Sequence, residues 1–135
     1  MLIVDDERTV RDVARAALEI AGFTVELAVS GEQAIEEFDR MGDGVALVLL
    51  DLTLPGMSGR RVLEQLRERR PALPILLTSG YSVEEAADLV AQPGTAFIPK
   101  PWRPKDLIEE AQRLMDGVVR SRAGDGDEPD ASRRS

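Results

Sequence analysis

The sequence contains no cysteine and no histidine among its 135 residues. Without cysteine, the chain can form no disulfide, no thiolate nucleophile and no cysteine metal site. Without histidine, it lacks the most common general base, the most common transition-metal ligand and any phosphohistidine of its own. A metal site in this chain would therefore depend on oxygen ligands, which favour Mg²⁺ or a similarly hard cation.

Positive charge is also scarce. The chain has 17 Lys and Arg against 25 Asp and Glu, which gives a formal net charge of -8. A nucleic-acid-binding surface needs a basic stripe to contact phosphates, so this balance argues against a nucleic-acid partner.

Long hydrophobic runs are absent as well. No apolar run approaches the roughly 20 residues of a membrane span. The opening MLIV is followed at once by DDER, which does not resemble a signal peptide. We therefore expect a cytoplasmic domain that does not itself enter a membrane. The apolar fraction of 43% and the charged fraction of 31% are typical of one globular domain with its own core.

The carboxyl-terminal stretch SRAGDGDEPDASRRS has no apolar periodicity and is rich in Gly, Asp, Ser and Arg. Such composition cannot bury enough apolar surface to fold. We expect a folded domain over residues 1–118 and a disordered tail over residues 119–135.

Strand and helix patterns alternate five times along the chain. Short apolar or alternating runs predict strands over residues 2–4, 23–28, 45–50, 74–78 and 95–98. Helical spacing predicts helices over residues 8–21, from Ser30 to near Gly42, and from Ser58, Ser82 and Pro104 onward. Parallel strands need crossover connections, so the pattern predicts an α/β, doubly wound parallel sheet with helices on both faces.

In such a sheet, ligands bind at the carboxyl ends of the strands. Polar residues follow four of the predicted strands at this edge: Asp5, Asp6 and Glu7, then Asp51, then Ser79, then Lys100. Carboxylates brought together raise each other's pKa unless a cation neutralises them, and Mg²⁺ is the expected one. A metal ion, an ammonium and a hydroxyl around one carboxylate suit phosphoryl transfer.

Each of these signals also has a plainer interpretation. An acidic pair after a strand is commonly a solvated turn, and Asp51 could simply be the polar end of a buried strand. The joint placement favours the functional interpretation, because all four groups fall at carboxyl ends and none at amino ends.

The segments VDDE, LLDLTLPGMSG, LLTSGY and FIPKP, in this order, resemble the receiver domain of two-component response regulators, the CheY-like superfamily. The resemblance covers essentially residues 1–118. It implies a flavodoxin-like (βα)5 fold with strand order 2-1-3-4-5.

The resemblance implies that Asp51 is the phosphoacceptor for a phosphohistidine on a histidine kinase or a histidine phosphotransfer domain. It implies that Asp6, Asp51 and the backbone carbonyl of Thr53 bind Mg²⁺, or Mn²⁺ in its place, with Asp5 beside them. Lys100 would pair with the phosphoryl group, and the Lys100-Pro101 bond would be cis.

The resemblance also implies a switch. Ser79 would bind a phosphoryl oxygen, and the loop after the fourth strand would then move inward. Phe97 would turn into the space that this loop leaves, which would change the surface of the fourth helix, fifth strand and fifth helix. Thr53 and Tyr81 would lie beside the acyl phosphate, and we hypothesise that Tyr81 limits water access and slows hydrolysis.

Two contexts stay open: a stand-alone regulator, and the carboxyl-terminal receiver of a hybrid histidine kinase, which LLTSGYS and KPWRPKDL favour. In either, the domain would catalyse only its own phosphorylation and dephosphorylation. A downstream protein partner and a homodimer through the fourth and fifth helices are further expectations.

Two other functions compete with the receiver interpretation. Asp51-Leu52-Thr53 also fits the start of a haloacid-dehalogenase phosphatase motif, but such enzymes carry a second Asp where Thr53 stands and a cap domain that this length hardly permits. A degenerate receiver used only for binding is the other alternative. The sequence gives no reason to choose it, because every expected site residue is present: Asp5, Asp6, Asp51, Ser79 and Lys100.

Overall fold

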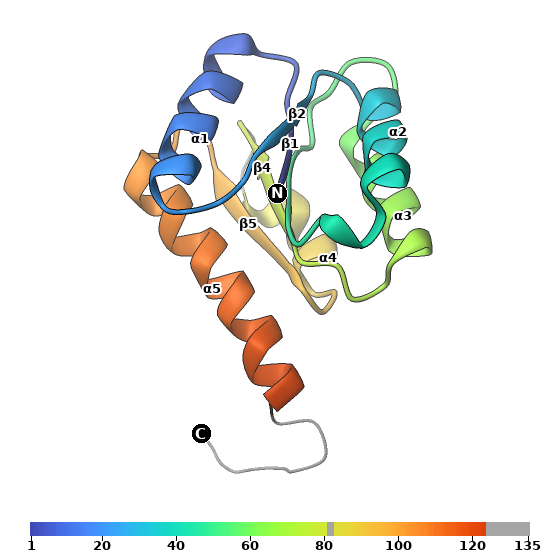
Figure 1. Ribbon diagram of the computed structural model, residues 1–135. Helices are drawn as coiled ribbons and strands as arrows, with labels where there is room; N and C mark the ends of the chain where they lie inside the picture. The colour runs from blue at the N-terminus through green and yellow to red at the C-terminus, as the bar shows by residue number, and fades with distance from the viewer. Residues whose placement is uncertain (81–82, 124–135) are drawn as a thin grey trace.

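The computed structural model describes residues 1–80 and 83–123. Its parallel sheet has the strand order β2-β1-β3-β4-β5 (Figure 1). The strands are β1 (Leu2–Val4), β2 (Glu26–Ala28), β3 (Val48–Asp51), β4 (Ile75–Ser79) and β5 (Thr95–Pro99). The doubly wound (βα)5 fold expected from the sequence is therefore confirmed, including its strand order.

Helices cover both faces of this sheet. They are α1 (Arg8–Ile20), α2 (Gly31–Met41), α3 (Gly59–Arg69), α4 (Ala87–Val90) and α5 (Pro104–Ala123), with short 3-10 helices η1 (Gly42–Gly44) and η2 (Val83–Ala86). In Figure 1, α1 and α5 lie together on one side of the sheet, and α2 and α3 lie on the other. Within the described residues, no helix combines the length and the apolar character needed to cross a bilayer.

The core has two layers because side chains alternate along each strand. Val4, Leu50 and Leu77 point toward α2, α3 and α4, whereas Ile3 and Leu49 point toward α1 and α5. All five of these side chains are at most 2% exposed. A sheet covered on both faces needs strands that are apolar throughout, which explains the continuous run before Asp51.

Local capping explains where two helices begin. Ser30 Oγ accepts a hydrogen bond from the Gln33 backbone N–H at 3.1 Å, and Ser58 Oγ accepts one from Arg61 at 3.2 Å. Both serines have extended backbone angles, as helix N-caps do, so the predicted starts at these residues are confirmed.

Some predicted boundaries shift. The strands expected from residues 23 and 45 begin later, at Glu26 and Val48, because both pair with β1, which begins only at Leu2. The predicted helix start at Ser82 lies outside the described residues. Helix α5 continues to Ala123, so the domain boundary expected at residue 118 falls within this helix. The rest of the expected tail, residues 124–135, also lies outside the described residues.

Candidate functional site

The carboxyl ends of four strands bring the predicted site residues together. Asp5 follows β1, Asp51 ends β3, Ser79 ends β4 and Lys100 follows β5. The Lys100 backbone N–H donates to the Ser79 carbonyl at 2.8 Å, which extends the pairing of β4 and β5 by one step. Asp5, Asp51 and Ser79 are each at most 2% exposed. The sheet therefore fixes the backbone of every one of these groups.

Three carboxylates converge at this edge. Asp5, Asp6 and Asp51 each place an oxygen within 4.8 Å of the others, and only Asp6 of the three is exposed. Asp51 Oδ1 accepts two hydrogen bonds from Thr53, one from the backbone N–H at 2.9 Å and one from the hydroxyl at 2.7 Å. These two bonds hold the orientation of the Asp51 carboxylate and leave its Oδ2 free to face Lys100.

The Lys100 ammonium lies among carboxylates. Its Nζ is 2.9 Å from Asp5 Oδ2, 3.2 Å from Asp51 Oδ2 and 3.3 Å from Glu7 Oε1. Burial alone would lower the pKa of Lys100, but the close ion pair with Asp5 and the charge of Asp51 outweigh it and raise this pKa to about 12. Lys100 is therefore a permanent cation at neutral pH.

Asp5 is a buried carboxylate beside Lys100. Burial raises the pKa of Asp5 above its ordinary 3.8, against the lowering effects of the Glu7 backbone N–H and of Lys100. Its Oδ1 accepts that N–H at 2.9 Å. Its Oδ2 is close to Lys100 but has no hydrogen bond of acceptable geometry within the described residues.

These features suit a hard divalent cation. The converging side chains offer only oxygen atoms, and one buried oxygen, Asp5 Oδ2, lacks a hydrogen-bond donor among the described residues. Mg²⁺ prefers a few carboxylate ligands and retains water on its other positions, which the exposed Asp6 allows. The residues present therefore fit Mg²⁺, and they fit Mn²⁺ for the same reason.

The predicted switch residues lie in different surroundings. Ser79 is buried at the end of β4, and Phe97 is half-buried in β5, where it packs against the core layer under α2, α3 and α4. Tyr81 lies outside the described residues. The Lys100-Pro101 peptide bond is cis, as the resemblance implied.

Sequence reasoning missed the role of Gly59, the first residue of α3. A Cβ at this position would lie 2.4 Å from the Leu52 Cα and 2.5 Å from the Asp51 carbonyl oxygen, both backbone atoms. Helix α3 thus approaches the Asp51 backbone more closely than a side chain allows. The sequence shows only that Gly59 directly follows the helix-capping Ser58, which does not by itself reveal this close approach.

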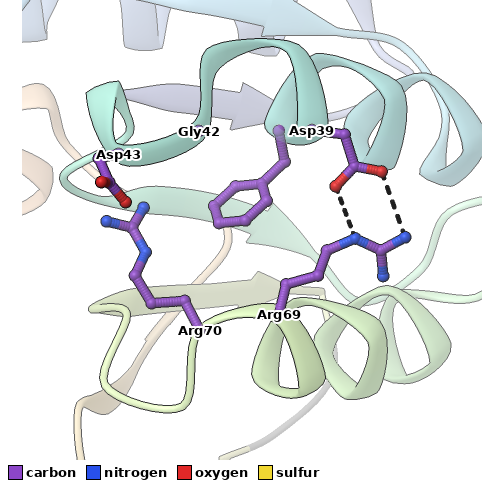
Figure 2. A pocket seen from close by; sticks show the side chains of 6 residues that line it. Asp39, Gly42, Asp43, Arg69 and Arg70 are labelled. Atoms are coloured by element: carbon purple, nitrogen blue, oxygen red, sulfur yellow. Dashed lines mark hydrogen bonds and ion pairs between the residues drawn. The ribbon is translucent and has the colours of Figure 1, made fainter.

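A second polar group lies at the opposite edge of the sheet, at the ends of α2 and α3. Figure 2 shows Asp39 and Arg69 pointing toward each other across a shallow hollow, with Arg70 on its other side. Arg69 donates to both Asp39 oxygens, at 2.7 and 3.3 Å, and the Arg70 guanidinium lies 5.2 Å from the centre of the Phe38 ring. These contacts are ion pairs and cation–ring contacts near the protein surface, with no cluster of carboxylates among the described residues there like the one around Asp5.

Comparison with known proteins decides the family. The family model of the response regulator receiver domain matches residues 1–112. The chain belongs to the response regulator receiver family. This receiver is 33% identical over 117 residues to the sensor kinase CckA of Brucella abortus, covering 86% of the chain and 12% of that protein.

The receiver is similarly related to a regulator and to a solved structure. It is 35% identical over 116 residues to the response regulator MprA of Mycobacterium ulcerans, covering 85% of the chain and 49% of that protein. A crystal structure of a CheY-like response regulator receiver domain protein from Methanospirillum hungatei matches with a TM-score of 0.78 and 30% identity, over 89% of this chain and 95% of that one. The receiver thus spans about half or less of these two curated relatives.

Membership of this family makes the chain a receiver of two-component signalling and not an enzyme of the ordinary kind. It leaves the haloacid-dehalogenase alternative without support. A histidine kinase is the kind of phosphodonor that a two-component receiver implies. The likeness to a sensor kinase and to a response regulator is compatible with both contexts considered for the parent protein.

Proposed function

We propose that Asp51 accepts a phosphoryl group from a phosphohistidine on a partner histidine kinase or histidine phosphotransfer domain. One observation carries this assignment. Asp51 is 1% exposed, yet its carboxylate is held by Thr53 on one oxygen and faces Lys100 on the other. A buried carboxylate that is held in one orientation beside a lysine is suited to act as a nucleophile.

The chain supplies position and charge for this reaction. An Asp51 oxygen forms a bond to phosphorus as the phosphorus–nitrogen bond of the donor histidine breaks, and the imidazole keeps the electron pair and takes up a proton from solvent. Lys100 stays charged throughout and pairs with the arriving phosphoryl oxygens. Asp6 and Asp51, with the Thr53 carbonyl and with Asp5 nearby, would hold Mg²⁺, which supplies positive charge for the transferring oxygens when bound.

The same event explains how the domain signals. A phosphoryl group adds nearly two negative charges and three acceptor oxygens next to Asp51. The Ser79 hydroxyl and Lys100 bind these oxygens, the loop after β4 moves inward, and Phe97 turns into the space that opens. This biases a two-state equilibrium, so the surface of α4, β5 and α5 changes for a downstream protein or a second copy of the chain.

Mass spectrometry tests the assignment. Incubated with Mg²⁺ and acetyl phosphate or phosphoramidate, the wild-type chain should gain one labile phosphoryl group. The Asp51→Asn variant should gain none. Equal labelling of both proteins would overturn the assignment, because it would show that another residue is the acceptor.

Two residues beside Asp51 are proposed to tune the lifetime of the acyl phosphate. Thr53 already contacts the carboxylate, and Tyr81 follows Ser79 by two positions. A bulky ring near the phosphoryl group would limit the approach of water. The Tyr81→Ala variant should therefore lose its phosphoryl group faster than the wild type, and an unchanged rate would exclude this role.

A further inference from the structure

Glu7 directly follows the acidic pair and has the third carboxylate in contact with Lys100. Its Oε1 lies 3.3 Å from Lys100 Nζ, across 93 positions of sequence. The Glu7 side chain is 62% exposed, whereas those of Asp5 and Asp51 are 3% and 1% exposed. Glu7 is therefore the only one of these three carboxylates that solvent reaches freely.

The contact is not a by-product of helix capping. Glu7 occupies the N-cap position of α1 with extended backbone angles, but its side chain makes no capping hydrogen bond. Ser, Thr, Asp and Asn are the residues that stabilise a helix at this position, so Glu7 adds little to the stability of α1. The Glu7 backbone is fixed by its N–H bond to Asp5 and by the Arg11 N–H that its carbonyl accepts. The side chain is left to reach Lys100.

An ammonium group has three N–H donors. Asp5, Asp51 and Glu7 give Lys100 three negatively charged neighbours within 3.3 Å. Asp51 and Glu7 each accept a hydrogen bond from Lys100, and Asp5 forms an ion pair with it, so an arriving phosphoryl oxygen competes with these three groups for the ammonium. Asp51 itself becomes the acyl phosphate, and the buried Asp5 cannot turn into water. The exposed Glu7 is therefore the neighbour that can give way, because a surface ion pair is weak.

We propose that Glu7 is a positioning residue that competes with the phosphoryl group for Lys100. This inference rests on the proposed phosphorylation of Asp51. In the unphosphorylated domain, Glu7 holds the ammonium at the mouth of the site, over Asp5 and Asp51. On phosphorylation, Lys100 exchanges Glu7 for a phosphoryl oxygen. Glu7 therefore weakens the binding of the phosphoryl group and shortens the lifetime of the phosphorylated state.

Beryllofluoride, which mimics an acyl phosphate, gives the direct test. At saturating Mg²⁺, Glu7→Gln should bind beryllofluoride about 2- to 5-fold more tightly than wild type, the range of one exposed ion pair. The fluorescence of Trp102, two residues beyond Lys100, serves as the signal. Mg²⁺ alone should bind Glu7→Gln no more tightly than wild type, since a negative charge has been removed.

Asp12→Asn is the matched control. Asp12 is an exposed α1 carboxylate, 63% exposed and 3.8 Å from Arg8, with no contact to Lys100. Its removal changes the net charge equally and should leave beryllofluoride binding unchanged. Glu7→Asp keeps the charge on a shorter side chain and should fall between Glu7→Gln and wild type.

The outcomes separate this inference from the function on which it rests. If Glu7→Gln binds beryllofluoride no better than wild type, or if Asp12→Asn gains the same affinity, Glu7 does not act through Lys100. If Asp51 of the wild type takes up neither phosphoryl group nor beryllofluoride, the proposed function fails as well.

Discussion

Charged side chains make different contacts at the two edges of the sheet. At the amino edge, arginines satisfy carbonyls: Arg67 donates to Pro71, Leu73, Pro93 and the Thr95 hydroxyl, and Arg70 donates to Val45. Of the Arg67 nitrogens, only Nε is buried without a partner. At the carboxyl edge, carboxylates crowd around one lysine and Asp5 Oδ2 has no hydrogen bond among the described residues.

This difference separates stability from function. Hydrogen bonds from the Arg67 guanidinium to backbone carbonyls connect α3 to the segments that lead into β4 and β5, so these contacts serve the stability of the fold. The carboxyl edge brings Asp5, Asp6 and Asp51 together beside one lysine. Burial also raises the pKa of Asp5. An edge with these groups is suited to bind Mg²⁺ and then a phosphoryl group, as phosphoryl transfer requires.

The largest effect is expected from Lys100→Met, at the carboxyl edge. Removing one preorganised cation should slow phosphorylation by acetyl phosphate about 10²- to 10³-fold. The same change removes a positive charge beside Asp5 and Asp51, so Mg²⁺ should bind more tightly. Rates from mass spectrometry and Mg²⁺ affinity from Trp102 fluorescence check both parts. A rate within twofold of wild type would show that the ammonium has no part in the chemistry.

At the amino edge, Arg67→Ala should lower the free energy of unfolding by about 2–3 kcal/mol, because several carbonyl groups lose their donor. The rate of phosphorylation, measured where the variant is folded, should not change. Urea denaturation gives the stability. Arg69→Ala, which breaks the exposed pair with Asp39 and one hydrogen bond to the Gln65 carbonyl, is the matched control and should be much milder. Equal losses from both variants would contradict the distinction between these arginines.

The sequence predicted the residues whose positions follow from local patterns, and it missed contacts between residues far apart in the chain. The sequence predicted Asp51, Ser79 and Lys100 at one edge, because the end of each strand can be recognised from local residues. In a parallel sheet, the carboxyl ends of the strands then lie at the same edge. The strand order came from family resemblance, since no local pattern encodes which strands pair. The contact of Glu7 with Lys100 was missed because it depends on the side-chain direction of one exposed residue.

The amino edge was not predicted at all. An arginine near the end of a helix is usually a solvated side chain, and nothing in RERRPALP reveals that Arg67 gathers carbonyls from two loops. The role of Gly59 was missed for a related reason. A glycine after a helix cap is common, and only the packing of α3 against Leu52 shows that a side chain is excluded.

Gly59→Ala links the two edges, because α3 begins beside Asp51 and ends beside the arginines. Its new Cβ would overlap backbone atoms, so we expect a loss of about 1–3 kcal/mol and slower phosphorylation through displacement of the Asp51 loop. Gly44→Ala is the control, since its Cβ would meet nothing within 4 Å. A Gly59→Ala protein as stable and as reactive as wild type would show that the approach is not tight.

The smallest effect is expected from Ser58→Ala, which removes the α3 cap. The loss should be about 1 kcal/mol, as for other N-caps. Ser30→Ala, at the start of α2, should cost a similar amount, because both serines make the same bond. Thermal denaturation of both variants checks this. A much larger loss at Ser58 would mean that the cap also supports the Asp51 loop.

The central claim is that the carboxylates of the carboxyl edge form a site for a divalent cation and that the amino edge, in the part of the chain that the structure describes, forms none. Titration of the ¹⁵N-labelled domain with Mn²⁺, followed by NMR, tests it most directly. The amide signals of Asp5, Asp6, Asp51 and Thr53 should broaden first and most strongly, Mg²⁺ should reverse the broadening, and Asp51→Asn should weaken it. Broadening that begins instead around Asp39 and Asp43, or none at all, would contradict the claim.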